Sequence, residues 1–307
     1  MLKQVRRTLI HQLWDKYRSQ SVQTQLIEKG LKHKGIQKFA LDHFAVIDLP
    51  GLHTGISHLN QLFSAIGYIV QGRDYLPDKQ NDFLWMTECD SLHSPAAEVL
   101  PQVVVADFRL DELPLTIRKI IEKYAAKTRP SPVPEAQKLA GRAYLGDEAA
   151  ANNLYSLITH YLSGRDWPLP TINEFHTVQA FNELLAWVLV FGRTPNHFTL
   201  SVHLLDHFSD LNAFHAFIET EVELPLNQDG GVIKGGPSVG IAQGSTAGMP
   251  KTIPLADGSI QLPTDFVEFV WRYPCYPSVK PVLWEDYFTG FVAQHADRVI
   301  ESLYGDQ

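Results

Sequence analysis

The sequence has little cysteine: Cys89 and Cys275 are the two cysteines among 307 residues. They are too far apart in the chain to form a C-x-x-C metal knuckle, and one pair of thiols does not make a disulfide framework. We therefore expect both cysteines to be reduced and to serve as structural residues.

Long apolar runs and clusters of basic residues are also absent. No stretch approaches the roughly 20 apolar residues that cross a bilayer. The N-terminus lacks the apolar core and small-residue cleavage site of a secretory signal, so we expect a cytoplasmic protein. The 26 lysines and arginines stand against 34 aspartates and glutamates, which leaves a formal net charge of −8. Such a chain has no basic surface to neutralise phosphates, so neither nucleic acid nor a membrane is an expected partner.

The composition is that of an ordinary globular protein, with 45% hydrophobic and 20% charged residues. The order of helical and strand-like patterns predicts an α+β fold rather than regularly alternating α/β units. We expect a single domain over residues 1–307. Its parts are an N-terminal helical segment (1–35), a helical insertion (128–192) and two β-rich portions (36–127 and 193–300).

The opening segment MLKQVRRTLIHQLWDKYRSQ is basic and amphipathic, which fits two interpretations. An organelle transit peptide has this character. However, Leu9, Leu13, Trp14 and Tyr17 form a stripe at helical spacing that would pack well on a domain. The stripe favours a folded helix.

Polar and apolar residues alternate in PNHFTLSVHLL, residues 195–205. Successive side chains of a strand point to opposite faces. His197, Thr199, Ser201 and His203 would then share one face, and the apolar residues between them would share the other. We expect a strand over 197–205 whose polar face looks toward a site.

Two further predicted strands carry one polar residue on an inward face. In KFALDHFAVIDLPG, His43 shares a face with Ala45 and Ile47, and in DFVEFVWRYP, Glu268 is embedded among apolar residues. A buried carboxylate needs a cation, a metal or a proton. Together with His197 these residues would form the 2-His-1-carboxylate arrangement of non-haem Fe(II) oxygenases. A lone strand histidine is more often a hydrogen-bonded core residue, so spacing alone leaves this triad a hypothesis.

Other patterns are weaker. His203 and His207 have metal-ligand spacing only on a helix, whereas the pattern there predicts the end of a strand. A glycine-rich loop, NQDGGVIKGGPSVGIAQGSTAG, contains a G-x-S-x-G match at residues 236–240. A proline before the serine and no helical pattern after it argue against a hydrolase nucleophile elbow. GGVIKGG lacks the ending of a phosphate-binding loop.

Several irregular motifs occur together between about residues 40 and 300. They are DHFAVIDLPG, PQVVVADFRLDEL, RTPNHFTLSV, GGVIKGGPSVGIAQGSTAG, DFVEFVWRYP and YFTGFVAQHAD. In this order they resemble the 2-oxoadipate dioxygenase/decarboxylase family, long known as a domain of unknown function. The resemblance implies a vicinal-oxygen-chelate-like fold, with a curved β-sheet or half-barrel around a metal site and with N-terminal and inserted helices.

The resemblance also implies a chemistry. Carried over by position, the family's metal ligands fall on His43, His197 and Glu268, the same three residues that their facing selects. The implied cofactor is Fe(2+), and the implied substrates are a small-molecule 2-oxo acid and O₂; 2-oxoadipate would give 2-hydroxyglutarate. No catalytic residue is expected beyond the metal ligands. The candidates for the substrate pocket are Ile47, Thr199, Gln243, Ser245 and Thr246.

The sequence departs from the family pattern where a substrate carboxylate would bind. Ile47 stands where the family has an arginine, which is expected to hold that carboxylate by a bidentate pair. The segment GRDYLPDKQNDFLW lacks the paired lysines of close relatives, and Gly244 replaces a usual serine. Either Lys234 or Arg272 supplies the charge, or the substrate is less acidic at its far end.

These observations favour an Fe(II)-dependent dioxygenase and decarboxylase of a 2-oxo acid. Two alternatives stay open. One is a glyoxalase-type lyase or isomerase that uses Zn²⁺ or Ni²⁺ without O₂. The other is a non-catalytic ligand-binding homologue, which Ile47 suggests. The sequence makes no prediction of the oligomeric state.

Overall fold

The computed structural model describes residues 1–276 and 281–292. Within them, one mixed sheet of eight strands has the order β2-β3-β4-β1-β5-β10-β7-β6, and β8 and β9 form a separate hairpin. The strands are β1 (Leu41–Ile47), β2 (Tyr68–Leu76), β3 (Asn81–Glu88), β4 (Gln102–Phe108), β5 (Phe198–Ser201), β6 (Lys234–Gly236), β7 (Ile241–Ser245), β8 (Pro250–Leu255), β9 (Gly258–Pro263) and β10 (Glu268–Arg272).

The centre of the sheet joins strands from the two β-rich portions of the chain. β1 pairs in parallel with β4 and antiparallel with β5. β5 pairs in parallel with β10, and β10 pairs antiparallel with β7. The predicted α+β class is therefore confirmed, and β1, β5 and β10 lie next to one another although they are far apart in the sequence.

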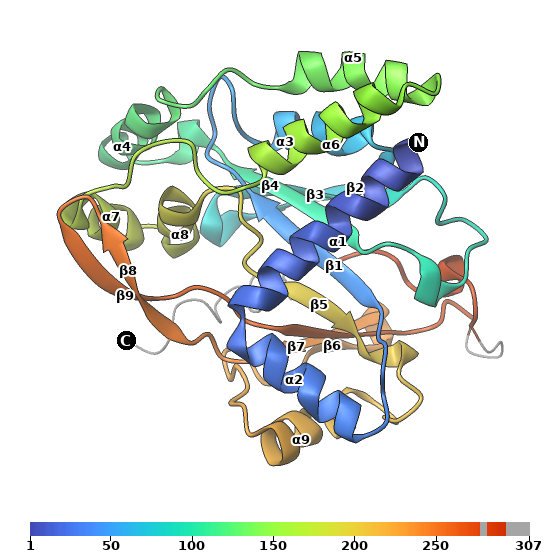
Figure 1. Ribbon diagram of the computed structural model, residues 1–307. Helices are drawn as coiled ribbons and strands as arrows, with labels where there is room; N and C mark the ends of the chain where they lie inside the picture. Colours follow the sequence, from blue (N-terminus) through green and yellow to red (C-terminus); the bar gives the residue numbers. More distant parts are fainter. Residues whose placement is uncertain (277–280, 293–307) are drawn as a thin grey trace.

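Helices cover the sheet, and α1 runs across it in Figure 1. The helices are α1 (Leu2–Gln20), α2 (Val22–His33), α3 (Ile56–Ala65), α4 (Leu115–Ala125), α5 (Val133–Tyr144), α6 (Glu148–Tyr161), α7 (Ile172–Gln179), α8 (Glu183–Phe191) and α9 (Leu211–Phe217). A π-helical turn, Ile218–Val222, continues α9. None of the helices in the described part of the chain is long and apolar enough to cross a membrane.

The apolar stripe of α1 packs on the sheet as the sequence predicts. Leu9, Leu13 and Tyr17 are buried in one cluster with Phe44 and Phe198. The hydroxyl of Tyr17 donates a 2.5 Å hydrogen bond to a backbone carbonyl just before β10. The stripe thus covers the apolar side of β1 and β5, and their other side is left for the polar residues.

The prediction that residues 227–248 form a glycine-rich loop is wrong from Lys234 to Ser245. This part of the segment contains β6 and β7, and β7 is the direct neighbour of β10. The prediction failed because the strand carries Gly244, a residue that usually marks a turn. A Cβ on Gly244 would lie 2.2 Å from the Cε1 atom of His215, so the strand needs glycine where this ring packs against it.

The strand predicted at 197–205 is wrong beyond Ser201. The chain turns there into a 3-10 helix, Val202–Leu204. The ring of His203 consequently packs against Tyr287, with centroids 4.8 Å apart, instead of following His197 along a strand. His207 is exposed in the following turn. These two histidines therefore do not share one face of a helix, as their sequence context indicated.

Both cysteines differ from the expectation of structural residues. Cys89 and Cys275 are free, as predicted, but both are exposed rather than packed in the core. Strand β2 was also not predicted. Its residues are mostly exposed or half-buried because it lies at the edge of the sheet, so it lacks the apolar alternation that marks a covered strand.

Candidate metal centre

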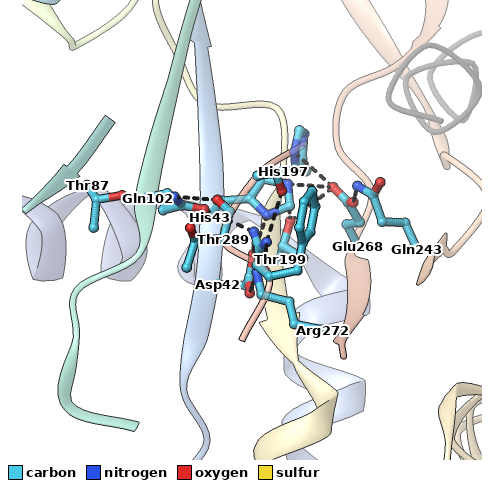
Figure 2. Close-up of polar contacts among 12 residues, drawn as sticks. Asp42, His43, Thr87, Gln102, His197, Thr199, Gln243, Glu268, Arg272 and Thr289 are labelled. Atoms are coloured by element: carbon cyan, nitrogen blue, oxygen red, sulfur yellow. Dashed lines mark hydrogen bonds and ion pairs between the residues drawn. The ribbon is translucent and has the colours of Figure 1, made fainter. Parts of the chain in front are cut away.

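Three neighbouring strands bring His43, His197 and Glu268 together (Figure 2). His43 lies within β1, His197 directly precedes β5, and Glu268 begins β10. An oxygen of Glu268, Oε2, lies 3.2 Å from Nε2 of each histidine. One ligand atom from each residue lies within 4.8 Å of the others, and all three side chains are buried.

The preceding residue orients each of the two imidazoles. Nδ1 of His43 lies 2.8 Å from Oδ1 of Asp42, and Nδ1 of His197 lies 2.6 Å from Oδ1 of Asn196. Both oxygens are acceptors, so they hold the proton on Nδ1 and leave Nε2 to face Glu268. Outer hydrogen bonds of this kind are typical of metal-bound histidines. Sequence reasoning missed Asp42 and Asn196, although the dipeptides Asp-His and Asn-His were available as a signal.

Glu268 is held from two further sides. The hydroxyl of Thr199 lies 3.0 Å from Oε2 and 3.1 Å from Nε2 of His43. The amide nitrogen of Gln243 donates a 2.6 Å hydrogen bond to Oε1 of Glu268. Thr199 stands beside Glu268 in the parallel β5–β10 pair.

The protonation of the three groups is strongly coupled. Burial opposes ionisation of Glu268, but the two neighbouring histidines hold the pKa of its carboxyl well below the usual range. Burial also disfavours a charged His43, yet the carboxylates of Glu268 and Asp42 raise the pKa of His43 to about 9. Burial lowers the pKa of His197, and Glu268 only partly opposes this effect. The pocket therefore favours one cation between its carboxylate and its imidazoles, which a metal ion can supply.

Asp42 is fixed by Arg272 from β10. All five N–H donors of Arg272 are used. Nε and Nη2 donate to the carboxylate of Asp42 at 2.7 and 2.8 Å, and Nη2 also donates to Gln102. Nη1 donates to the backbone carbonyls of Phe288 and Gly290. Burial opposes ionisation of Asp42, but Arg272 keeps its pKa below the usual range. Arg272 therefore has no donor left for a substrate carboxylate, and its suggested role as an anchor is wrong.

A cavity adjoins the three residues. The described residues that line it are His43, Ala45, Ile47, Leu76, Asn81, Phe83, Val104, Ala106, His197, Gln243, Glu268 and Phe291. The ring of Phe291 meets that of His43 edge-on, with centroids 4.8 Å apart. The predicted pocket residues Ile47 and Gln243 thus line the same cavity as the three candidate ligands.

The other three predicted pocket residues are not among the residues that line this cavity. Thr199 contacts Glu268 and His43 through its hydroxyl. Ser245 is buried and pairs in register with Glu268. The hydroxyl of Thr246 contacts Gln23 and accepts from the backbone of Val267, so it joins the N-terminal helices to the sheet. Neither Ser245 nor Thr246 lines the cavity.

A family model described as 2-oxoadipate dioxygenase/decarboxylase matches residues 8–274. The chain belongs to the 2-oxoadipate dioxygenase/decarboxylase family. A curated relative, the chloroplastic 2-oxoadipate dioxygenase/decarboxylase of Arabidopsis thaliana, is 28% identical over 281 residues, which are 88% of this chain and 70% of the relative. The predicted family and its oxidoreductase character are therefore confirmed.

Solved structures share the fold of this chain. Hydroxyglutarate synthase from Oryza sativa, in complex with 2-oxoadipate, superposes with a TM-score of 0.78 at 25% identity and covers 100% of this chain and 94% of its own. A glyoxalase-superfamily protein from Ralstonia eutropha JMP134 reaches a TM-score of 0.76 at 17% identity, covering 94% and 86%. The predicted vicinal-oxygen-chelate-like half-barrel is confirmed by these two likenesses.

Proposed function

We propose that this chain is an Fe(II)-dependent dioxygenase that decarboxylates a 2-oxo acid with O₂. The supporting observation is a buried set of two imidazole nitrogens and one carboxylate oxygen, within 4.8 Å of one another, in a member of this family. This donor set suits Fe(II) in non-haem oxygenases, where it leaves positions for the substrate and O₂. The proposal takes residues 1–307 as one metal-dependent domain in the cytoplasm.

The residues around the proposed ligands have distinct tasks. Asp42 and Asn196 keep the Nδ1 protons in place, so that both Nε2 atoms are free to bind a metal. Thr199 and Gln243 hold the carboxylate of Glu268 in one orientation. When bound, Fe(II) would supply the site at which the 2-oxo acid is chelated and O₂ is reduced.

Aromatic rings pack against both imidazoles and would limit the access of water to them. The ring of Phe266 stacks on His197 with centroids 4.7 Å apart, and Phe291 covers His43. A water-poor cavity strengthens the interaction between a charged ligand and the metal centre. It also protects reactive species from water.

Recognition of the far end of the substrate has changed, because Ile47 occupies the position of the family's arginine. The relative from Oryza sativa was crystallised with 2-oxoadipate. We propose that this chain binds a substrate with the same 2-oxo acid head group as 2-oxoadipate but with a different group at the far end. Ile47 lines the cavity, so it is placed to contact that group.

Metal analysis and oxygen uptake test the proposal together. Protein loaded anaerobically with Fe(II) should bind one equivalent and consume O₂ with at least one member of a panel of 2-oxo acids, releasing CO₂. Tight iron binding without O₂ consumption across the panel would count against the proposal. Turnover that persists without O₂ and survives replacement of iron by Zn²⁺ or Ni²⁺ would favour the glyoxalase-type alternative.

Substitution of the carboxylate tests the proposed ligand set. Glu268→Ala should abolish iron retention while the circular dichroism spectrum stays that of the folded protein. Glu135→Ala, on the exposed side of α5, is the matched control and should retain iron. Unchanged iron content in Glu268→Ala would exclude this set of ligands.

A further inference from the structure

The cavity beside the proposed ligands has an apolar wall built from three adjacent strands. Ala45 and Ile47 follow His43 on the same face of β1. Val104 and Ala106 stand opposite them in the parallel β1–β4 pair. Across the next pair, Ala106 is in register with Phe83 of β3, which also lines the cavity. A ligand that extends from the metal site along β1 therefore meets hydrocarbon surface.

Apart from the candidate ligands, the polar side chains among the described lining residues are the uncharged amides of Asn81 and Gln243. Asn81 donates its amide hydrogen to the backbone carbonyl of Asp107 at 2.8 Å. Gln243 donates to Glu268, and its own Oε1 atom is buried with no hydrogen-bond partner among the described residues. An amide oxygen accepts hydrogen bonds and repels a carboxylate. Gln243 carries no charge and its amide nitrogen is bonded to Glu268, so it is a poor anchor for an anion.

The part of the wall that the structure describes carries no positive charge. Among the described residues that line the cavity there is no lysine or arginine. Arg272 lies behind His43 and uses all its donors elsewhere. Lys234, the other suggested anchor, is buried on β6 and is not part of the lining. Among residues 1–276 and 281–292, no cation on this wall replaces the arginine expected at the position of Ile47.

The charges allow one substrate carboxylate and disfavour a second. A divalent metal with Glu268 and two neutral imidazoles carries one net positive charge, which matches the carboxylate of the 2-oxo acid head group. A second carboxylate beside Ile47 would be buried without a partner, which is strongly unfavourable. A hydrocarbon group at the same place would bury apolar surface, which is favourable.

We propose that the substrate is a 2-oxo monocarboxylic acid with an aliphatic or aromatic side chain, an inference that rests on the proposed function. The reaction would be R–CH₂–CO–COO⁻ + O₂ → R–CHOH–COO⁻ + CO₂. The bond between C1 and C2 breaks and C1 leaves as CO₂. One oxygen atom of O₂ enters the new carboxylate and the other forms the hydroxyl group. Decarboxylation and hydroxylation each supply two electrons, which together reduce O₂.

A substrate panel tests this inference on the iron-loaded full chain. The apolar members are 4-methyl-2-oxopentanoate and phenylpyruvate, and the acidic members are 2-oxoadipate and 2-oxoglutarate. We expect kcat/KM for the better apolar acid to exceed that for either dicarboxylate by on the order of 100-fold. Equal or higher kcat/KM for a dicarboxylate would overturn the inference while leaving the proposed function intact.

Binding measured without O₂ separates the two proposals. Calorimetric titration of the iron-loaded protein under nitrogen should show tighter binding of the apolar acids. If no member of the panel consumes O₂, the proposed function fails. The titration alone then decides whether the cavity prefers apolar acids or dicarboxylates. Tighter binding of a dicarboxylate would overturn the inference in that case also.

An arginine at position 47 should reverse the preference for apolar acids over dicarboxylates. Ile47→Arg should raise kcat/KM for 2-oxoadipate relative to the apolar acids by on the order of 100-fold. The matched control, Leu145→Arg, places the same charge at a position that is 85% exposed and should keep the wild-type preference. An Ile47→Arg protein that folds and still prefers apolar acids would contradict the role given to this wall. If that variant does not fold, the wild-type panel decides.

Discussion

Arg272 and Asp42 form a buried ion pair directly behind the proposed ligand His43, through two hydrogen bonds of 2.7 and 2.8 Å. The pair joins β10 to β1, the two strands that carry Glu268 and His43. The same guanidinium binds the carbonyls of Phe288 and Gly290, which shortly precede Phe291 in the chain. One side chain therefore supports a proposed metal ligand and the aromatic residue that packs against it.

Loss of this arginine should destabilise the protein strongly. Arg272→Gln leaves the carboxylate of Asp42 buried without its cation, so we expect a loss of about 3–5 kcal/mol in the free energy of unfolding. Arg109→Gln is the matched control. It breaks another two-bond pair, with Asp82, whose side chains are each 37% exposed. Urea denaturation should show a loss of at most about 1 kcal/mol for the control. Equal losses of unfolding free energy in the two variants would show that the buried pair of Arg272 contributes no more stability than the exposed pair.

Asn196 should affect metal affinity more than stability. Asn196→Ala removes the acceptor for Nδ1 of His197, so the ring can rotate or change tautomer. We expect Fe(II) affinity to fall about 10–100-fold, measured by anaerobic competition titration. Asn196→Asp restores an acceptor and should recover most of the affinity. Recovery would show that orientation of the imidazole matters, whereas equal loss in both variants would point to general damage at the site.

Gly244 should not tolerate the serine that the family usually has. A Cβ at this position would lie 2.2 Å and 2.4 Å from Cε1 and Nε2 of His215. We expect Gly244→Ser to lower the free energy of unfolding by about 1–3 kcal/mol through overpacking. Adding His215→Ala should recover part of this loss. The control is Gly141→Ser in α5, where an added Cβ would meet no neighbouring side chain within 4 Å, and it should be nearly neutral.

His215 should make stability depend on pH. Burial, together with nearby Lys234, lowers the pKa of His215 to about 4 from its ordinary value of 6.5. The ring also lies against Phe269, which offers no counter-charge. Because the unfolded chain takes up the proton more readily, stability falls as the pH drops from 6.5 toward 4. The loss from this residue is about 2 kcal/mol at pH 5.

Removal of the imidazole should flatten that dependence. We expect His215→Leu to lose less stability than the wild type between pH 7.5 and pH 5, as measured by urea denaturation. His207→Leu, at an exposed histidine, is the control and should follow the wild type. Parallel curves for wild type and His215→Leu would contradict the lowered pKa.

The two-residue alternation of side chains along a strand was sufficient to predict which residues of β1 face the cavity. His43, Ala45 and Ile47 were predicted to share a face, and all three line the cavity. The reason is that a strand covered by helices on its other side must point every second residue the same way. The same rule assigned Thr199 to the polar face of its strand, and the parallel pairing of β5 with β10 then sets it beside Glu268.

Alternation failed where a long-range contact overrides local pattern. Ser201 ends β5, and the chain turns so that His203 meets Tyr287, which is distant in the sequence. β7 escaped detection because the space for a side chain at Gly244 is taken by His215 of α9. Neither contact changes the pattern of polar and apolar residues in the neighbouring sequence. Periodicity alone therefore could not predict either contact.

The sequence by itself determined the residue types and facing of the candidate ligands, and its motifs resembled the right family. Those properties are local, since they follow from the two-residue repeat of a strand and from short motifs. Only the tertiary structure decided which charges face the cavity. It paired Arg272 with Asp42 and set hydrocarbon beside Ile47, because these contacts join distant strands and depend on how the sheet is assembled.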